Sequence, residues 1–185
     1  FFFFLKRSLS DSPAFWALTG LLILVAVAFV ITEINNFRYN RLQKRQKENQ
    51  EILDQSFRTF AKIIDAKDPY TKGHSSRVAC YSKMLAQEIG LSEDDQRRIY
   101  YIGLLHDIGK ISVTDNILNK PGKLTDFERE VIQTHVEVGG DILKDFTAIP
   151  EISDGARYHH ERWDGKGYSA HLKAQEIPYF ARIIC

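Results

Sequence analysis

Five of the six histidines in this 185-residue chain are placed where their side chains could share a metal site. They are His74, His106, His135, His159 and His160, with successive spacings of 32, 29 and 24 residues before the adjacent pair. A single helical histidine is usually hydrogen bonded or on the surface. Imidazole and carboxylate groups from facing helices, however, converge in a bundle core to bind two metals. The spacing fits one ligand group per helix, and Asp107, directly after His106, supplies a carboxylate.

The types of ligand narrow the choice of metal. Neither Cys80 nor Cys185 stands beside these positions, so a thiolate zinc site is disfavoured. Nitrogen and oxygen donors with a bridging carboxylate suit iron, manganese or zinc. Lys110 follows His106 by four residues and shares its face of a helical turn. Its ammonium is suited to holding phosphate oxygens where negative charge develops, and the alternative is a solvated surface lysine.

The elements that must position these residues are helices, so the sequence predicts an all-α fold. Gly90 is suited to end a helix that begins near His74, and Ser92 to cap the next one. Thr125 and Glu128 form a capping-box pattern that opens a third helix, which runs through Leu143. Pro150 can start a fourth helix, which would carry His159 and His160.

An apolar segment precedes these helices. Residues 12 to 32 contain no charged residue and no histidine, which matches the roughly 20 residues that a helix needs to cross a bilayer. We expect a transmembrane helix over 12–34, after an N-terminal flank over 1–11; a signal peptide is the alternative. Five basic residues between positions 38 and 47, against two before the span, predict that the C-terminal part lies in the cytoplasm.

A helical connector is expected over residues 35–59. From Leu53, the apolar positions advance by four, three and four residues, which predicts a buried helical stripe. The stripe consists of Leu53, Phe57, Phe60 and Ile64. The connector would leave the membrane as a solvated helix and then pack against the following domain or against a twin helix in a homodimer. The chain after residue 53 is nearly neutral, so its charge does not predict a nucleic acid polymer as partner.

Five motifs follow one another along the chain. They are Asp68-Pro69-Tyr70-Thr71 with His74, then His106-Asp107-Ile108-Gly109-Lys110, then His135, then His159-His160-Glu161, and then Asp164-Gly165-Lys166-Gly167-Tyr168. Over residues 60–185 the chain resembles an HD-GYP domain, a helical member of the HD superfamily of phosphohydrolases. This resemblance implies a bacterial signalling enzyme that hydrolyses cyclic di-GMP to the linear dinucleotide pGpG or to GMP.

The resemblance also implies residue roles. His74, His106 and Asp107 would hold one divalent metal, with Asp107 bridging to a second. The second metal would be held by His135, His159 and His160. Iron or manganese is expected, with zinc as the alternative. Asp107 and Lys110 would be catalytic, Lys110 on the scissile phosphate, while Gly167 and Tyr168 would border the substrate.

Three departures from the family pattern stand out. Ser169 follows Tyr168 where the family has proline, which puts partner recognition through this loop in doubt. Tyr70 occupies the position of a carboxylate that holds a third metal in some members, so two metals are expected. The family supplies a further aspartate ligand after the segment that resembles residues 178–184, so we expect a C-terminally incomplete domain and, since Phe1 is not methionine, a fragment.

These features favour a phosphodiesterase at the inner membrane with its catalytic domain in the cytoplasm. Cyclic di-GMP, the membrane and, from the resemblance, diguanylate cyclase domains are the expected partners. Two alternatives stay open. One is a non-catalytic module that binds nucleotide or protein, and the other is a hydrolase of another cyclic dinucleotide. His171 is excluded from the metal set.

Overall fold

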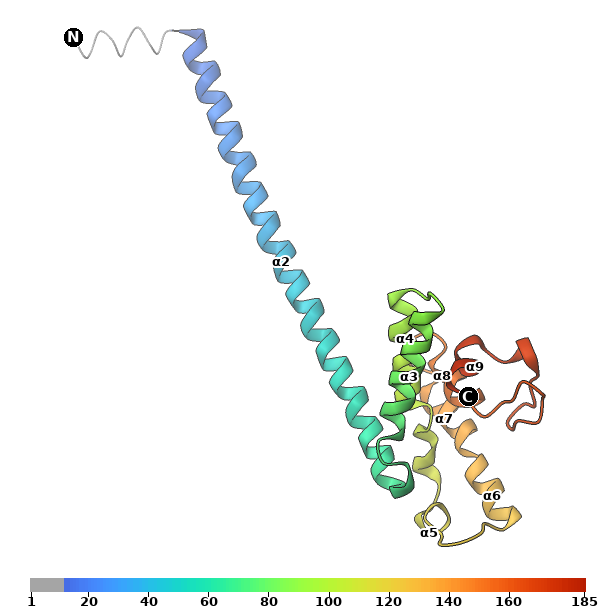
Figure 1. The fold of residues 1–185 in the computed structure, drawn as a ribbon. Coiled ribbons are helices and arrows are strands. Elements are labelled where there is room, and N and C mark those ends of the chain that lie inside the picture. The colour runs from blue at the N-terminus through green and yellow to red at the C-terminus, as the bar shows by residue number, and fades with distance from the viewer. Residues whose placement is uncertain (1–11) are drawn as a thin grey trace. The chain divides into compact units, whose positions relative to one another are not determined.

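The computed structural model describes residues 12–185, and every regular element among them is a helix (Figure 1). The all-α prediction is therefore confirmed for the described part of the chain. The predicted flank over 1–11 lies outside the described residues. The chain divides into two compact units, Phe1–Ile52 and Leu53–Cys185, which we describe separately.

Helix α2 runs without interruption over Pro13–Lys67. It is the one described helix long and apolar enough to cross a bilayer, judged by length and composition. Side chains of its apolar segment, such as Leu22 and Phe29, are exposed in the structure. The helix begins one residue after the predicted start at 12 and continues through the other predicted limits, at 34, 35 and 59, which stay predictions.

The last turns of α2 belong to the second unit and bury one face. Phe57, Ala61 and Ile64 are buried there, and Phe57 packs edge-on against Tyr101. Phe60, which the predicted stripe included, is 48% exposed, so that prediction was wrong at this position. Ala61 is buried in its place. The buried positions advance by four residues from Phe57 to Ala61 and by three from Ala61 to Ile64, whereas the predicted stripe advanced by three and then by four.

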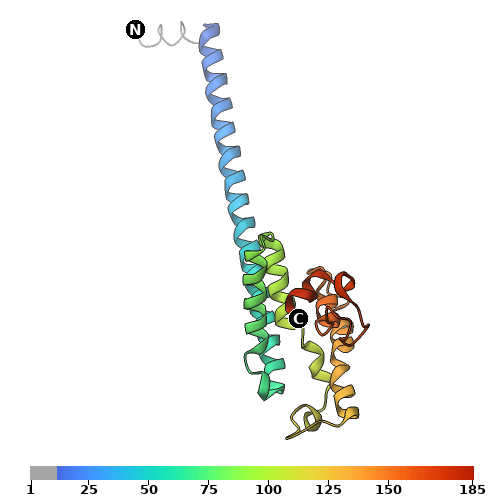
Figure 2. The same ribbon diagram turned by 45° about the vertical axis from the view of Figure 1, so that its right-hand side comes forward.

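Helices α3 (His74–Glu88) and α4 (Glu93–Leu105) form a hairpin beside this end of α2, and both views show them side by side (Figure 2). Gly90 takes a positive φ of 76° after α3, and the hydroxyl of Ser92 accepts a hydrogen bond from the Asp95 amide at the start of α4. Both predicted helix boundaries are confirmed. The C-terminal half of α4 is fully buried from Ile99 to Leu105 and forms the centre of the core.

Short helices complete the second unit. They are η1 (Pro69–Thr71), η2 (Ile108–Ser112), α5 (Asp115–Leu118), α6 (Asp126–Gln133), α7 (His135–Leu143), α8 (Ile152–Tyr158), η3 (Ala174–Glu176) and α9 (Tyr179–Ile184). The predicted capping box of Thr125 and Glu128 opens α6. Helix α7 packs against α8 and η2, and α8 packs against α4.

Two predicted helices differ from the structure. The helix expected from Thr125 to Leu143 is divided at Thr134, where the side chains of Thr134 and His135 bond the carbonyls of Val131 and Ile132. In an unbroken helix these carbonyls would accept from backbone amides. The helix expected from Pro150 begins only at Ile152, since Glu151 has a positive φ of 64°.

Candidate metal centre

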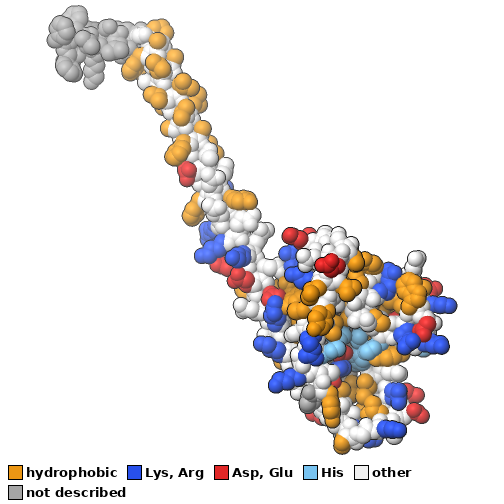
Figure 3. Space-filling model, viewed as in Figure 1, with side chains coloured by type: hydrophobic (Ala, Val, Ile, Leu, Met, Phe, Trp, Pro, Cys, Tyr) orange, Lys and Arg blue, Asp and Glu red, His pale blue; other side chains and the backbone are white. Residues whose placement is uncertain are grey.

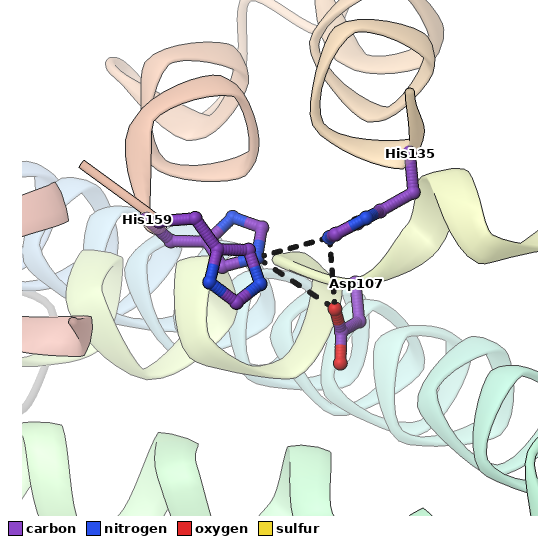
Figure 4. A group of neighbouring side chains, drawn as sticks. Asp107, His135 and His159 are labelled. Carbon is purple, nitrogen blue, oxygen red and sulfur yellow. Dashed lines mark hydrogen bonds and ion pairs between the residues drawn. The ribbon is translucent and has the colours of Figure 1, made fainter. Parts of the chain in front are cut away.

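The Asp107 carboxylate lies at the centre of the predicted site, between α4 and η2. One of its oxygens, Oδ1, lies 3.4 Å from His135 Nε2 and 3.6 Å from His159 Nε2. These two nitrogens are 3.3 Å apart, and Figure 4 shows all three side chains pointing toward one another from different elements. His160 completes a group whose ligand atoms lie within 4.8 Å of one another. We call this group the second half-site.

The other oxygen of Asp107, Oδ2, faces a different pair of histidines. It lies 3.3 Å from His106 Nε2 and 3.7 Å from His74 Nε2. The two imidazole nitrogens are 3.3 Å apart. We call His74, His106 and Asp107 the first half-site. A carboxylate that presents one oxygen to each of two groups of ligands is arranged as a bridge.

Three of the histidines have their tautomer fixed by the backbone. The Nδ1 atoms of His106, His135 and His159 lie 2.8, 2.7 and 2.9 Å from the carbonyls of Gly103, Ile132 and Ala156. A carbonyl oxygen can only accept, so each Nδ1 donates to its carbonyl, and each Nε2 is left facing Asp107. Hydrogen bonds of this kind orient metal-binding histidines.

The arrangement suits a cation. The Nε2 atoms of His135 and His159 lie 3.3 Å apart while both Nδ1 atoms are bonded to backbone carbonyls, so both Nε2 atoms are available to bind one cation. A metal that holds two nitrogens at about 2.1 Å separates them by roughly 3.0–3.4 Å, and both imidazole pairs fit. Burial lowers the pKa of His159 to about 4, so the ring stays neutral. Burial raises the pKa of Asp107, but contact with His106 and the other histidines outweighs it and holds the pKa well below its usual value.

Lys110 lies beside the first half-site and is held by two carboxylates. Its Nζ is 2.9 Å from Asp107 Oδ2 and 3.3 Å from Asp68 Oδ2. Burial lowers its pKa, but contact with Asp107 and Asp68 outweighs this and raises the pKa. Asp68 also accepts a hydrogen bond from the Tyr70 amide, so it both caps a turn and orients the lysine. The ammonium is therefore charged and fixed beside the candidate metals.

A loop after the paired histidines folds back over the second half-site. Tyr168 stacks on the His160 ring at a centroid distance of 4.7 Å. A Cβ on Gly167 would lie 2.6 Å from the carbonyl oxygen of His160, so only glycine fits this approach. With the histidines, both residues line a cleft of about 400 Å³, and Arg162 and Lys166 line its rim. Figure 3 shows a patch of histidine side chains on the surface of this unit.

The position after Tyr168 has a backbone that proline cannot adopt. Ser169 has a φ of 104°, and its hydroxyl donates a hydrogen bond to Glu137 on α7. Proline is locked near −65°. Where the family has proline, this loop therefore has a serine whose side-chain hydrogen bond connects it to α7.

All the predicted site residues lie in or around this cleft. His159 and His160, expected on a helix, instead follow the end of α8. His171 is exposed and belongs to neither half-site. Sequence reasoning missed Glu161, which is fully buried: one carboxylate oxygen accepts from the Ala170 amide at 2.7 Å, and the other has no partner among the described residues. Nothing in the sequence distinguishes this buried acid from an exposed one.

Comparison with known proteins adds family membership. Residues 58–185 match the family model described as HD domain. The chain is 42% identical over 125 residues to 3′3′-cGAMP-specific phosphodiesterase 3 of Vibrio cholerae, covering 68% of this chain and 27% of that protein. It is 38% identical over 140 residues to a cyclic di-GMP phosphodiesterase of Thermotoga maritima, covering 74% of this chain and 38% of that protein.

A solved structure has a similar fold. It is the crystal structure of a cyclic GMP-AMP-specific phosphodiesterase of V. cholerae, with a TM-score of 0.51 at 20% identity, and the match covers 69% of this chain and 38% of that chain. The chain thus spans only about a quarter to two fifths of the length of these relatives. Because the family model covers most of the sequence, the chain belongs to the HD domain family.

Proposed function

We propose that this chain hydrolyses a phosphodiester bond of a cyclic dinucleotide, using two divalent metals held by the two half-sites. The observation that carries the proposal is the Asp107 carboxylate, whose oxygens face two separate groups of imidazole nitrogens. The nitrogen and oxygen donors favour iron or manganese, with zinc as the alternative. Relatives named for the hydrolysis of cyclic GMP-AMP and cyclic di-GMP support the class of substrate.

The residues of the site have distinct tasks in this reaction. Two metals bound there would neutralise charge on the phosphoryl oxygens and lower the pKa of a water molecule to supply the nucleophile. Asp107 and the histidines hold that centre, and Lys110 donates hydrogen bonds to a phosphate oxygen as its charge grows. Water adds to phosphorus while the P–O bond to one ribose oxygen breaks, and that oxygen takes a proton. The ring opens to a linear dinucleotide, and a second hydrolysis gives mononucleotides.

Two substrates deserve direct comparison. Cyclic di-GMP is the first, because similar proteins from T. maritima and Xanthomonas campestris are named as cyclic di-GMP phosphodiesterases. Its products would be pGpG or GMP. The mixed 3′3′-cyclic GMP-AMP is the second, because three matching V. cholerae proteins at 39–42% identity are named for it. Gly167 and Tyr168 would border either nucleotide from the loop over the cleft.

The remaining expectations concern location and partners. We propose that α2 anchors the protein in the inner membrane with the HD domain in the cytoplasm, supported by the length and apolar composition of the helix and the basic residues that follow. A homodimer through residues 35–59 and contact with diguanylate cyclase domains stay predictions. Membrane fractionation with and without residues 12–34 tests the anchor: a chain that stays soluble with the segment present would rule it out.

The catalytic proposal is tested with the intact protein. Bound iron, manganese and zinc are quantified, and the hydrolysis of both cyclic dinucleotides is followed by chromatography. Asp107→Ala should lower the rate at least about 100-fold, because a lost ligand must cost more than the 10–100-fold typical of residues that only orient ligands. His171→Ala is the matched control, since this exposed histidine lies outside both half-sites.

The outcomes separate the open readings. Two metals per chain with Asp107-dependent hydrolysis of either dinucleotide supports the proposal, and the ratio of the two kcat/KM values assigns the substrate. A folded protein that binds two metals and hydrolyses neither would instead support a non-catalytic nucleotide-binding or interaction module.

A further inference from the structure

The two half-sites differ in how their histidines are oriented. His106, His135 and His159 each donate from Nδ1 to a carbonyl three residues earlier. For His74, no described residue forms a hydrogen bond with Nδ1, and its side chain is 38% exposed. Apart from its contact with the His106 ring, the position of this ring therefore depends on the backbone that carries it. That backbone is the first turn of α3, of which His74 is the first residue.

The first turn of α3 has no cap of its own. The N-cap residue is Gly73, in a left-handed conformation with a φ of 71°, and it offers no side-chain acceptor. The first four amides of a helix lack partners within the helix, so their position usually depends on a capping acceptor. At this helix the acceptor comes from another element.

Asp65, near the end of α2, supplies that acceptor. Its Oδ1 lies 2.7 Å from the hydroxyl and 3.5 Å from the amide nitrogen of Ser75, the residue after His74. Asp65 is 8% exposed and Ser75 is fully buried, so water does not replace this bond when it is lost. The contact lies wholly within the unit Leu53–Cys185.

We propose that Asp65 is a positioning residue for the first half-site: by capping α3 from α2, it fixes His74 at the metal. The inference rests on the proposed metal centre but not on the substrate. It gives α2 a direct role at the site, because the helix that carries the apolar segment also sets the position of one ligand. Asp65 touches neither substrate nor metal.

The test is metal binding by the intact protein. Asp65→Ala should weaken the first metal by about 10–100-fold, the loss typical of residues that orient a ligand, and leave the second metal in place. Asp65→Asn keeps an acceptor oxygen and should restore most of the loss. Asp54→Asn is the matched control: it lies on the same helix, pairs with Arg58 and should change nothing.

Paired variants identify the affected half-site. In a His74→Ala background the first half-site is already lost, so adding Asp65→Ala should cause no further loss of metal. In a His160→Ala background the same addition should remove the metal that remains. Hydrogen exchange in the metal-free protein gives an independent readout: the Ser75 amide should exchange at least about tenfold faster in Asp65→Ala, the loss expected for one hydrogen bond.

The inference fails if Asp65→Ala binds two metals with unchanged affinity, or if the folded variant loses both metals in parallel. If Asp65→Ala does not fold, Ser75→Ala takes its place, because it removes the shorter of the two bonds to Asp65, and unchanged affinity for the first metal in Ser75→Ala would overturn the proposal. Failure of the proposed function looks different: the wild-type protein would bind two metals, respond to Asp65→Ala as expected, and hydrolyse neither dinucleotide.

Discussion

Gly109→Ala probes the closest backbone approach at the site. A Cβ on Gly109 would lie 2.6 Å from the Gly139 nitrogen and closer still to the carbonyl oxygen of His135, whereas real Cβ atoms essentially never come within 3.0 Å of another atom. Both neighbours are backbone atoms of α7, so no side chain can rotate away. Either η2 or the start of α7 must move, and the clashing oxygen belongs to a candidate ligand.

The cost follows from this geometry. Overpacking typically destabilises by about 1–3 kcal/mol, and backbone neighbours favour the upper end, which lowers Tm by roughly 10 °C in a domain of this size. A displacement on the order of 1 Å between Asp107 and His135 should cost about 100-fold in rate. Thermal unfolding, metal content and hydrolysis of a cyclic dinucleotide measure these effects on one preparation.

A control lies on the opposite side of the same contact. At Gly139 an added Cβ comes no closer than 3.3 Å to any atom, so Gly139→Ala should be much milder. The reasoning is refuted if Gly109→Ala keeps the wild-type Tm, metal content and rate, or if the two variants are equally damaging.

Substitutions at three further positions test the loop and one helix start. Glu161→Gln keeps the bond to the loop amide and removes a buried charge with an unpartnered oxygen, so it should change Tm little, whereas Glu161→Ala should lose about 1–3 kcal/mol in thermal unfolding. Ser169→Pro cannot reach a φ of 104° and should destabilise by more than Ser169→Gly, which adopts that angle freely; urea unfolding compares them. Lys120 holds the pKa of Glu128 at about 2 against 4.5 in the unfolded chain. The stability that this pair contributes is therefore complete above pH 4.5 and lost as the pH falls toward 2, and Glu128→Gln should flatten that part of a Tm-against-pH curve.

The parts that the sequence predicts well are those encoded by neighbouring residues. Ser92 and the Thr125–Glu128 pair begin helices where expected, and Gly90 ends one, because caps act within four residues. The clustering of five histidines with Asp107 follows from residue types on successive helices and from the resemblance, while their roles as ligands stay a prediction. The helix ends are encoded by residues within one turn, and the histidine cluster is encoded by a recurring sequence motif.

The parts that the sequence misses depend on distant contacts. The hydrogen bond between Ser75 and Asp65 joins two helices and residues ten positions apart. The sequence around Asp65 does not indicate that its carboxylate has a buried partner. The break at Thr134 coincides with the bond from His135 Nδ1 to the Ile132 carbonyl, which depends on the final direction of the His135 ring. The left-handed Glu151 delays α8 without a glycine to indicate it. Periodicity identifies the helices but not these contacts.

The placement of the ligands at helix ends has an electrostatic consequence. His106 follows the end of α4 and His159 the end of α8, whereas His135 follows α6 by two residues and is also the first residue of α7. Each ring bonds a carbonyl of the last turn, and that turn carries the negative end of the helix dipole. The negative ends of α4 and α8 therefore lie beside the Asp107 carboxylate, which favours a divalent cation there. His74 begins a helix and follows no α-helix end, so only the positive end of a dipole, which opposes a cation, lies beside it. The first half-site gains less from the fold, so it depends more on the acceptor that α2 supplies.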